Sequence, residues 1–515
     1  MQKPLLLISL LICQQLSAQL PEDALRSAWT VPSGTARQQA IGGAMGSLGG
    51  EISSAFVNPA GLGVYKTSEV VLSPGFRFLT DKSNYLGASS SGKPANNFNL
   101  GTSGAIFSYT GRNGNDNVFS VAVNRMANFN SNVYYKGEND YSSFSEQYAE
   151  EFAASGYGIE QALGSPNISY GTRMALYTYL IDTATINGNL QVIGQPQKAG
   201  RVMQENNLQS RGGITEIAFS LATSLQDKVY IGGSLGIPII NYTRYQTYHE
   251  SDATGNPNND FDSFTYQETF STKGFGVNGK IGVIVRPAAS WRVGLAIHSP
   301  TIFGLTDKIN ASMITRTENY TSHPQASISS DSLDRMAGID PPANSVSYDL
   351  YTPWKFILSG SYLFGGGEAD VKHQKGFITA DLEYSTNGSP RFRPANNDTE
   401  DQNDYYDSVN VGIKNSYKGS LGMRLGGELK FNTLMARAGL AYYTSPYKDK
   451  ALSADRLFVS AGVGYRNKGM FIDLAYVMGF SRDVSFPYRL GDKANTVATL
   501  KENGGTIIAT VGFKF

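Results

Sequence analysis

The chain ends in Thr506–Phe515 (TIIATVGFKF), a stretch in which apolar and polar side chains alternate. One face of the predicted strand is apolar and consists of Ile507, Ala509, Val511, Phe513 and Phe515. The other face carries Thr506, Thr510, Gly512 and Lys514, with Ile508 as the apolar exception. A period of two residues predicts a β-strand with one face in an apolar medium and the other in a polar one.

The segments 417–431, 433–445, 456–467 and 469–482 alternate in the same way. They are longer than strands of soluble proteins, which centre on about 5 or 6 residues. Their polar faces carry charged residues in mid-strand, such as Arg424, Arg437 and Asp473. Both features favour a transmembrane antiparallel β-barrel with a wet lumen over a soluble sandwich. Because lipid cannot pair backbone groups, such a sheet must close on itself.

The whole chain holds about fourteen candidate strands, an even number as in single-chain bacterial barrels. The nine further segments are 68–79, 102–112, 117–129, 213–225, 228–248, 264–286, 290–299, 353–364 and 374–385, with 504–515 as the last strand. Connections such as Asn467-Lys468-Gly469 are short, whereas 130–212, 249–263, 300–352, 386–416 and 483–503 are long. Long loops of such barrels face outward, so we expect both mature termini at the short-turn, periplasmic end.

The beginning of the chain reads as a secretory signal peptide, residues 1–18, with Lys3 before a short apolar run and Ser17-Ala18 before the cleavage point. Cys13 is the one cysteine, so the mature chain would contain no disulfide and no cysteine metal site. Basic and acidic residues balance at 43 each, which gives no indication of nucleic-acid binding. An exported barrel belongs in the bacterial outer membrane.

Residues 19–66 differ from the barrel that follows at 67–515. The stretch 36–63 (ARQQAIGGAMGSLGGEISSAFVNPAGLG) is too broken for a strand and too rich in glycine for a stable surface helix. We expect a compact insert, or hatch, inside the lumen, where small residues permit close backbone approach. The alternative is a disordered periplasmic arm.

Two features beyond the strands bear on a ligand path. In the third strand, alternation weakens after Asn124, at Met126, Ala127, Asn128 and Phe129, which indicates either a lateral opening or the extracellular end of the strand. Farther on, an amphipathic helix in an outer loop is predicted by the spacing of Phe144, Tyr148, Phe152, Ala153 and Tyr157. Its apolar face would pack on the barrel rim or line an entry groove.

The chain offers no candidate active site. We interpret the charges on the lumen face as structural ion pairs rather than catalytic pairs; they are Arg292, Asp381, Glu383, Arg424, Glu428, Lys430, Arg437, Arg466 and Asp473. The histidines at 249, 298, 323 and 373 are dispersed and lack metal-ligand spacing. Nucleotide-binding and hydrolase motifs are missing as well. We therefore expect neither an enzyme nor a bound metal or cofactor.

The ordered motifs resemble the FadL/TodX family of outer-membrane transport proteins. The resemblance covers nearly all of the mature chain and rests on Ser53–Phe56 followed by Asn58-Pro59-Ala60-Gly61-Leu62, Arg286-Pro287, Trp291–Leu295, His298-Ser299-Pro300, Thr352–Lys355, Arg437–Leu440, Ser445-Pro446, Gly462–Tyr465 and Ile472–Tyr476. The loops do not match closely, and loops often determine ligand choice.

The resemblance implies a fourteen-stranded barrel plugged by a hatch, with passive uptake of hydrophobic molecules such as long-chain fatty acids or aromatic hydrocarbons. It also implies entry at an outer loop groove and lateral exit through a kinked third strand, with Asn124, Met126, Ala127, Asn128 and Phe129 as the candidate opening. The hatch and gate residues would be Phe56, Val57, Asn58, Pro59, Ala60 and Leu62. Partners would be hydrophobic small molecules or lipids, including outer-membrane lipid.

Two other functions remain open at this point. The barrel could act as a docking partner in secretion or attachment machinery, with its loops as the contact surface. It could also be a haem-uptake receptor, since tyrosine and histidine serve as haem ligands. The ligand, the direction of transport and the oligomeric state do not follow from the sequence.

Overall fold

The computed structural model describes residues 21–30, 33–111, 115–186, 188–320, 324–365, 374–395, 400–450, 452 and 454–515. The predicted signal peptide lies outside these residues. Within them the chain forms a closed antiparallel barrel of fourteen wall strands, as predicted. Closure is made by the last strand, which pairs with β23 on one side and with β1 and β2 on the other.

Several wall strands are interrupted and consist of two or three segments. In chain order the wall strands are β1 (Glu69–Leu72) with β2 (Pro74–Tyr85); β3 (Ala88–Ser91) with β4 (Asn97–Leu100) and β5 (Ser103–Thr110); β6 (Asp116–Asn128) with β7 (Ser131–Asn139); β10 (Val202–Leu225); β11 (Val229–Asp252); β12 (Ser263–Ala288); β13 (Trp291–His298) with β14 (Ile302–Arg316); β16 (Ser345–Tyr351) with β17 (Lys355–Phe364); β18 (Gly376–Ser385) with β19 (Arg391–Pro394); β20 (Ser420–Phe431); β21 (Leu434–Tyr443); β22 (Arg456–Asn467); β23 (Met470–Ser485); and β24 (Ala498–Lys514).

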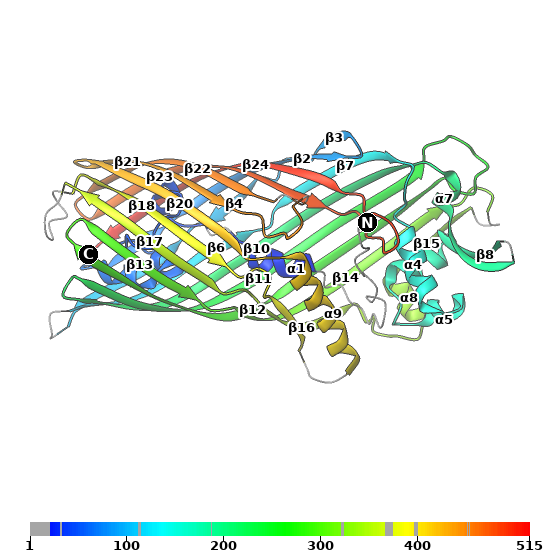
Figure 1. Ribbon diagram of the computed structural model, residues 1–515, viewed down its shortest axis with the longest axis horizontal. Helices are drawn as coiled ribbons and strands as arrows, with labels where there is room; N and C mark the ends of the chain where they lie inside the picture. Colours follow the sequence, from blue (N-terminus) through cyan, green and yellow to red (C-terminus); the bar gives the residue numbers. More distant parts are fainter. Residues whose placement is uncertain are drawn as a thin grey trace, which may run out of the picture.

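The remaining elements lie in the N-terminal segment and in the long loops; α4, α5, α7, α8, β8 and β15 gather at one end of the barrel, whereas α9 lies about midway along it (Figure 1). The N-terminal helices are α1 (Pro21–Ala28), α2 (Ala36–Ala40), α3 (Ser54–Val57) and the 3-10 helix η1 (Pro59–Val64). The loop elements are α4 (Glu146–Ser155), α5 (Ile159–Gly164), α6 (Tyr170–Tyr177), the hairpin β8 (Ile181–Ile186) and β9 (Asn189–Gly194), α7 (Gln195–Ala199), β15 (Gln325–Ser329), α8 (Ser330–Met336) and α9 (Glu400–Ser416).

The two faces of the wall carry the side chains that the alternation predicts. Leu440, Val463 and Leu474 are exposed on the outside, whereas Arg437 and Asp473 are buried on the inside. The strands are longer than predicted at the loop end: β10 and β11 have 24 residues each. A membrane-crossing strand needs about 9 to 11 residues. The wall therefore continues beyond the membrane and carries the loop helices.

Residues 21–64, called here the N-terminal segment, lie inside the barrel. Contacts run from α2 to β21–β24 and from α3 and η1 to β6, β10 and β11, and η1 also reaches β12. A segment that touches strands all around a closed wall has to occupy the lumen. The exceptional Ile508 is explained by this packing, because it lies against Ala36 and Ala40. The described segment is packed and is not a disordered arm.

The predicted position of the mature amino terminus, residue 19, falls outside the described residues. The C-terminal Phe515 bonds with Ser68 at the short-turn end, as predicted. The first described helix, α1, lies about midway along the barrel (Figure 1): Glu22 pairs with Arg489 of the loop before β24, and α1 contacts α9. Because α1 is amphipathic, with Leu25 and Trp29 buried, it packs among the loop-end aromatic residues instead of leaving toward the short turns.

Candidate functional site

Asn58 anchors the N-terminal segment to the wall. Its side chain is fully buried, and Nδ2 donates to the carbonyl of Gly46 at 2.6 Å and to that of Val283 on β12 at 3.3 Å. Oδ1 accepts from the backbone N–H of Ala60 at 3.1 Å and so caps η1, whose first residue is Pro59. Proline fixes φ and lacks a donor, which suits this first position.

Close approach of Asn58 to the wall depends on a glycine. A Cβ at Gly282 of β12 would lie 1.9 Å from Asn58 Oδ1, so no larger residue fits while the amide keeps its place. On the opposite wall, a Cβ at Gly439 of β21 would lie 2.1 Å from the backbone nitrogen of Gly42. The N-terminal segment thus lies directly on the glycines of the wall at both places, through the Asn58 side chain at Gly282 and through its backbone at Gly439.

Polar side chains of the wall hold the same segment by its backbone. The Asp381 carboxylate accepts from the N–H groups of Met45 at 3.0 Å and Gly46 at 3.1 Å. His298 Nε2 donates to the carbonyl of Val57 at 2.8 Å, and Arg292 donates to the carbonyl of Leu48. These groups come from two strands, β13 and β18, so the segment cannot shift as a unit without losing several buried hydrogen bonds.

Six of the nine predicted lumen charges form ion pairs in the described structure, whereas Arg292 bonds to the carbonyl of Leu48 and Lys430 to Gln374. Glu428 accepts from Arg37 of the N-terminal segment at 3.2 Å and from Arg437 at 2.7 Å. Arg437 in turn lies 2.6 Å from Asp473. In a second group, Arg424 lies 3.0 Å from Glu383 and 3.5 Å from Asp381. Each of these carboxylates is engaged by a guanidinium, which leaves none of them poised as a general base.

A cavity of about 500 Å³ lies in the lumen beside the N-terminal segment. Its lining combines apolar groups, such as Trp29, Leu79 and Phe458, with charged groups, such as Arg77, Asp483 and Glu502. Of the six predicted hatch residues, Val57 lines this cavity. The others lie elsewhere: Phe56 and Leu62 pack against the wall with Ile106 and Val118, Ala60 packs on Tyr230, and Asn58 and Pro59 face β11 and β12.

The wall beside this cavity has an interruption in its strand pairing. The β5–β6 ladder ends at Ser103 and Val123, whereas β4 pairs with β2 and not with β6. The candidate opening residues Asn124–Phe129 follow directly after this ladder, and Ala127, Asn128 and Phe129 line the cavity. Asn124 and Met126 turn to the N-terminal segment instead: the amide of Asn124 donates to the carbonyl of Ser33 at 3.0 Å.

Past the interruption the third strand continues as β7. It pairs with β10 from Ser131 to Asn139 and bonds back to the first strand, since Ser83 donates to the carbonyl of Tyr134 at 2.6 Å. The interpretation of Asn124–Phe129 as the extracellular end of the strand is therefore wrong. Paired strands lie both before and after the interruption, which is confined to a few residues.

The loop helix α4 packs on the wall. Phe144, just before the helix, stacks on Tyr248 of β11 with ring centroids 4.1 Å apart, and Tyr148 and Phe152 are buried in the same cluster. Ala153 is exposed and Tyr157 is half-buried. Two roles were predicted for the apolar face of this helix, packing on the barrel rim and lining an entry groove. The structure shows the packing on the rim.

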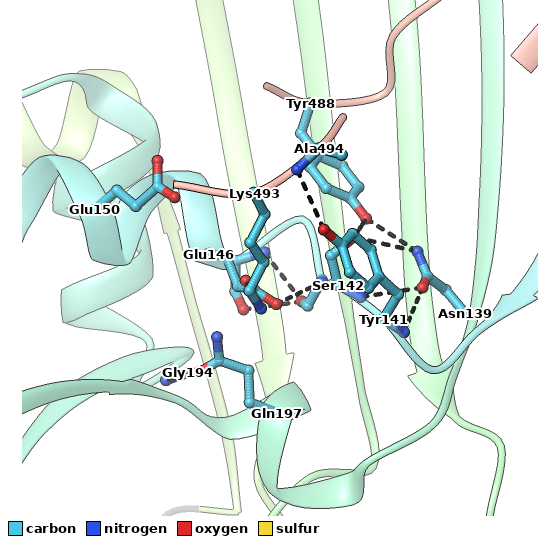
Figure 2. A network of polar contacts seen from close by, with 12 residues as sticks. Asn139, Tyr141, Ser142, Glu146, Glu150, Gly194, Gln197, Tyr488, Lys493 and Ala494 are labelled. Atoms are coloured by element: carbon cyan, nitrogen blue, oxygen red, sulfur yellow. Dashed lines mark hydrogen bonds and ion pairs between the residues drawn. The ribbon is translucent and has the colours of Figure 1, made fainter. Parts of the chain in front are cut away.

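The loops are joined across the mouth by the polar network in Figure 2. Tyr488, from the loop before β24, shares a hydrogen bond of 2.7 Å with Ser142 and accepts one of 3.1 Å from Asn139. Lys493 pairs with Glu146 at 2.6 Å. Glu150 accepts from the backbone N–H of Gly491 at 2.8 Å, and burial together with the side chain of Asp492 raises the pKa of Glu150 to about 7.

The loop helix α9 was not predicted from the sequence. Its inner face carries Tyr406, Val409 and Ile413, and with Tyr417 just beyond its end these residues pack against Leu25 of α1. The positions are spaced by 3 or 4 residues, so helical periodicity in the long 386–416 connection was the signal that could have found it. The helix covers the lumen on the side of α1.

A larger hollow, about 740 Å³, lies on the outer surface of the wall and is not the site. It is bordered by Leu358, Leu382 and Leu440, whose side chains are exposed on the face that the alternation assigns to lipid. Gly360 lies within it, where a Cβ would meet no atom within 4 Å. Lipid acyl chains would fill this shallow depression.

Membrane-spanning helices and metal sites are not found among the described residues. None of the described helices is both long and apolar enough to cross a membrane. No group of three His, Cys, Asp or Glu side chains in the described ranges is placed to hold a metal ion. Among the histidines, His249 bonds to Thr265 and His298 to the N-terminal segment, whereas positions 323 and 373 lie outside the described residues.

Comparisons with known proteins agree on the architecture. No family model and no curated protein matches the sequence. Among solved structures, a Pseudomonas aeruginosa FadL homologue superposes with a TM-score of 0.57 at 13% identity, covering 95% of this chain and 100% of that one. The P. putida toluene transporter TodX gives a TM-score of 0.52 at 12% identity, with coverage of 94% and 99%. At such identities the likeness concerns the fold, and this chain has the FadL/TodX type of barrel.

Proposed function

We propose that this protein is a bacterial outer-membrane channel for the passive uptake of hydrophobic molecules such as long-chain fatty acids. The observation that carries the proposal is the position of the 500 Å³ cavity, beside the N-terminal segment and next to the interrupted pairing of β4 and β6. The similarity to a FadL homologue and to a toluene transporter supports it at the level of fold.

In this proposal the N-terminal segment is the hatch. It blocks a straight path because three bonds fasten it to the wall: Asn58 to the Val283 carbonyl, Asp381 to the Met45 N–H, and Arg37 to Glu428. A ligand would descend from the loop end past α1 into the cavity and leave sideways at residues 124–129. Apolar lining contributes about 25 cal/mol per Å² of buried ligand surface. No covalent chemistry or energy source is required, and we propose that the protein is not an enzyme.

Binding can be tested through Trp29, which lines the cavity. The chain has three tryptophans, and Trp291 and Trp354 are exposed on the outside of the wall. A Trp291→Phe/Trp354→Phe variant in detergent leaves Trp29 as the reporter, and brominated hexadecanoate should quench its fluorescence saturably. The matched variant that also carries Trp29→Phe gives the background.

Native mass spectrometry of the gently extracted protein gives an independent readout, because a cavity ligand should survive as a bound mass. If Trp29 is not quenched and no hydrophobic molecule is retained, the channel proposal is wrong. A docking role for the loops would then become the better hypothesis, and co-purification with a fixed protein partner would test it.

A further inference from the structure

The outer face of three neighbouring strands changes from apolar to basic at one height. On β23 the outward residues from Ile472 to Phe480 are apolar and exposed, and the next outward residue is Arg482. Its register partner on β24 is Lys501, whose partner on β2 is Lys82. The three strands run side by side along the wall (Figure 1), and the three side chains, called here the basic row, are exposed. Register partners share one face of a sheet, so three cations are direct neighbours on the outer wall.

The basic row lies where the apolar band of an outer membrane would end. The strand from Ile472 to Arg482 rises about 34 Å along its own axis, at about 3.4 Å per residue. At a tilt of about 40° this is about 26 Å along the barrel axis, and the apolar band of such barrels is about 25 Å tall. Because the long loops face outward, the row faces the head groups of the outer leaflet.

The acids of these strands do not neutralise the basic row. No ion pair among the described residues includes Lys82, Lys501 or Arg482. Asp81 and Glu502 point to the other face of the sheet, where Asp81 is buried and Glu502 lines the lumen cavity. Like charges directly opposite one another destabilise a sheet. The row therefore calls for negative charge from outside the chain.

The acid that follows the row on the next strand is engaged elsewhere. Asp455 directly precedes β22, and its backbone carbonyl accepts from the N–H of Arg482 at 3.3 Å. Its carboxylate accepts from the N–H of Ser445 at 2.9 Å instead of pairing with the guanidinium. A loop cation close to the same strands is treated differently, since Arg489 pairs with Glu22 within the chain.

The surface on the membrane side of the row is suited to acyl chains. Phe480 of β23 and Phe78 of β2 are exposed on the outer face, and Met478 and Ile507 continue this apolar surface toward the short turns. A soluble phosphate would contact the row alone, whereas a phosphorylated lipid would contact both the row and the apolar surface. In bacterial outer membranes the outer leaflet consists largely of phosphorylated glycolipids, whose phosphates lie at the boundary of the acyl chains.

We propose that the basic row binds the phosphate groups of a phosphorylated glycolipid of the outer leaflet. The phosphates offset the repulsion among Lys82, Lys501 and Arg482, and the acyl chains lie over Phe480 and Phe78. The site is on the outside of the wall and takes no part in the ligand path. The inference rests on the outer-membrane location in the proposed function and on no other part of it.

The test measures binding of diphosphoryl lipid A to the full mature chain in neutral detergent, by titration with native mass spectrometry. A cation near an anionic lipid surface contributes a factor of about 5 in affinity. Each of Lys82→Gln, Lys501→Gln and Arg482→Gln should therefore weaken binding about 5-fold, and the triple variant about 100-fold. Heat-modifiable migration confirms the folding of each variant.

A charge-matched control removes three exposed cations outside the row, in the variant Lys228→Gln/Lys273→Gln/Lys418→Gln. Lys273 is the closest analogue, because it also lies on an outer face but has the neutral register partners Asn241 and Thr306. This control should bind lipid A within about 5-fold of the parent.

Thermal unfolding gives a second readout that a merely structural role of the row would not produce. Without lipid, the triple variant should unfold at the same temperature as the parent or at a higher one, because the repulsion within the row is gone. Added lipid A should raise the midpoint of the parent and leave that of the triple variant unchanged, because a ligand stabilises only the form that binds it.

The outcomes decide this proposal separately from the channel. The lipid site is refuted if the triple variant binds lipid A as tightly as the parent, if the charge-matched control loses as much affinity, or if fully dephosphorylated lipid A binds the parent equally well. Quenching of Trp29 by brominated hexadecanoate reports on the channel and should be the same in the parent and in the triple variant. Lipid A binding through the row without any quenching in the parent would refute the channel and leave the lipid site standing.

Discussion

The Asn58–Gly282 contact predicts a strong coupling between two mutations. Asn58→Ala leaves the carbonyl of Gly46 and the N–H of Ala60 without partners, bonds that measure 2.6 and 3.1 Å in the parent. At about 1–3 kcal/mol for each buried unpaired group, the packing of the N-terminal segment should lose about 2–6 kcal/mol. The barrel itself should persist, because its strand ladders do not involve Asn58.

Gly282→Ala should cause the same loss by another route. The new methyl would lie 1.9 Å from Asn58 Oδ1 and must expel the amide from its place. When Asn58 is already alanine, the remaining close contact is the carbonyl of Leu295 at 3.3 Å, which a small shift relieves. The double variant should therefore be much less destabilised than the sum of the single variants, with a coupling of about 1–3 kcal/mol.

Two measurements check this coupling. Hydrogen exchange over residues 36–64 gives the opening free energy of the N-terminal segment, and planar-bilayer recording gives ion leakage, which should rise in each single variant. Gly360→Ala is the control, because its new methyl meets nothing within 4 Å. Strictly additive free energies in the double variant, or leakage of Gly282→Ala equal to that of Gly360→Ala, would refute the reasoning.

Three further predictions concern the wall and the loops. Leu474→Arg places a charge on the lipid face and should destabilise the barrel by about 2–4 kcal/mol, seen as a lower unfolding midpoint in urea. Deleting Phe515 removes both backbone bonds to Ser68 that close the barrel end, so heat-modifiable monomer should form more slowly. Since the pKa of Glu150 is raised from 4.5 to about 7 in the folded contact, the α4 contact with Asp492 should be strongest below about pH 4.5 and weaken as the pH rises through 7. Protease cleavage in that loop should increase over this range in the parent and stay flat in Glu150→Gln.

The wall strands could be predicted from the sequence because each strand has one face toward lipid and one toward the lumen. Apolar and polar side chains therefore alternate along it. Leu474 is exposed on the outer face and its neighbour Asp473 is buried on the lumen face, so the two environments can be recognised from adjacent residues. The loop-end extensions of the wall could not be predicted. Both β7 and the part of β10 before Gly213 face water or loop helices, so apolar and polar residues alternate only weakly there. Tertiary packing, not local pattern, holds them in the sheet.

The position of the N-terminal segment had a signal that the sequence analysis did not use. Ile508, Phe471 and Ala475 are small or apolar residues on the lumen face, and each packs against the segment. Apolar residues on a face that should be wet indicate something covering it.

Energetics favour the wall over the lumen as the path in the proposed channel. A passive channel has only the ligand gradient to draw on, and a tenfold gradient is worth about 1.4 kcal/mol. Displacing the hatch would break the bonds of Asn58 to Val283, of Asp381 to Met45 and of Arg37 to Glu428 together, at about 1 kcal/mol or more for each bond. At the β4–β6 interruption the ladder bonds are already missing, so a ligand passing there breaks no strand pairing. The lateral route leaves the hatch bonds and the strand ladders intact, so its barrier is lower than that of the straight route, and in the proposed channel the hatch stays in place while the ligand passes through the wall.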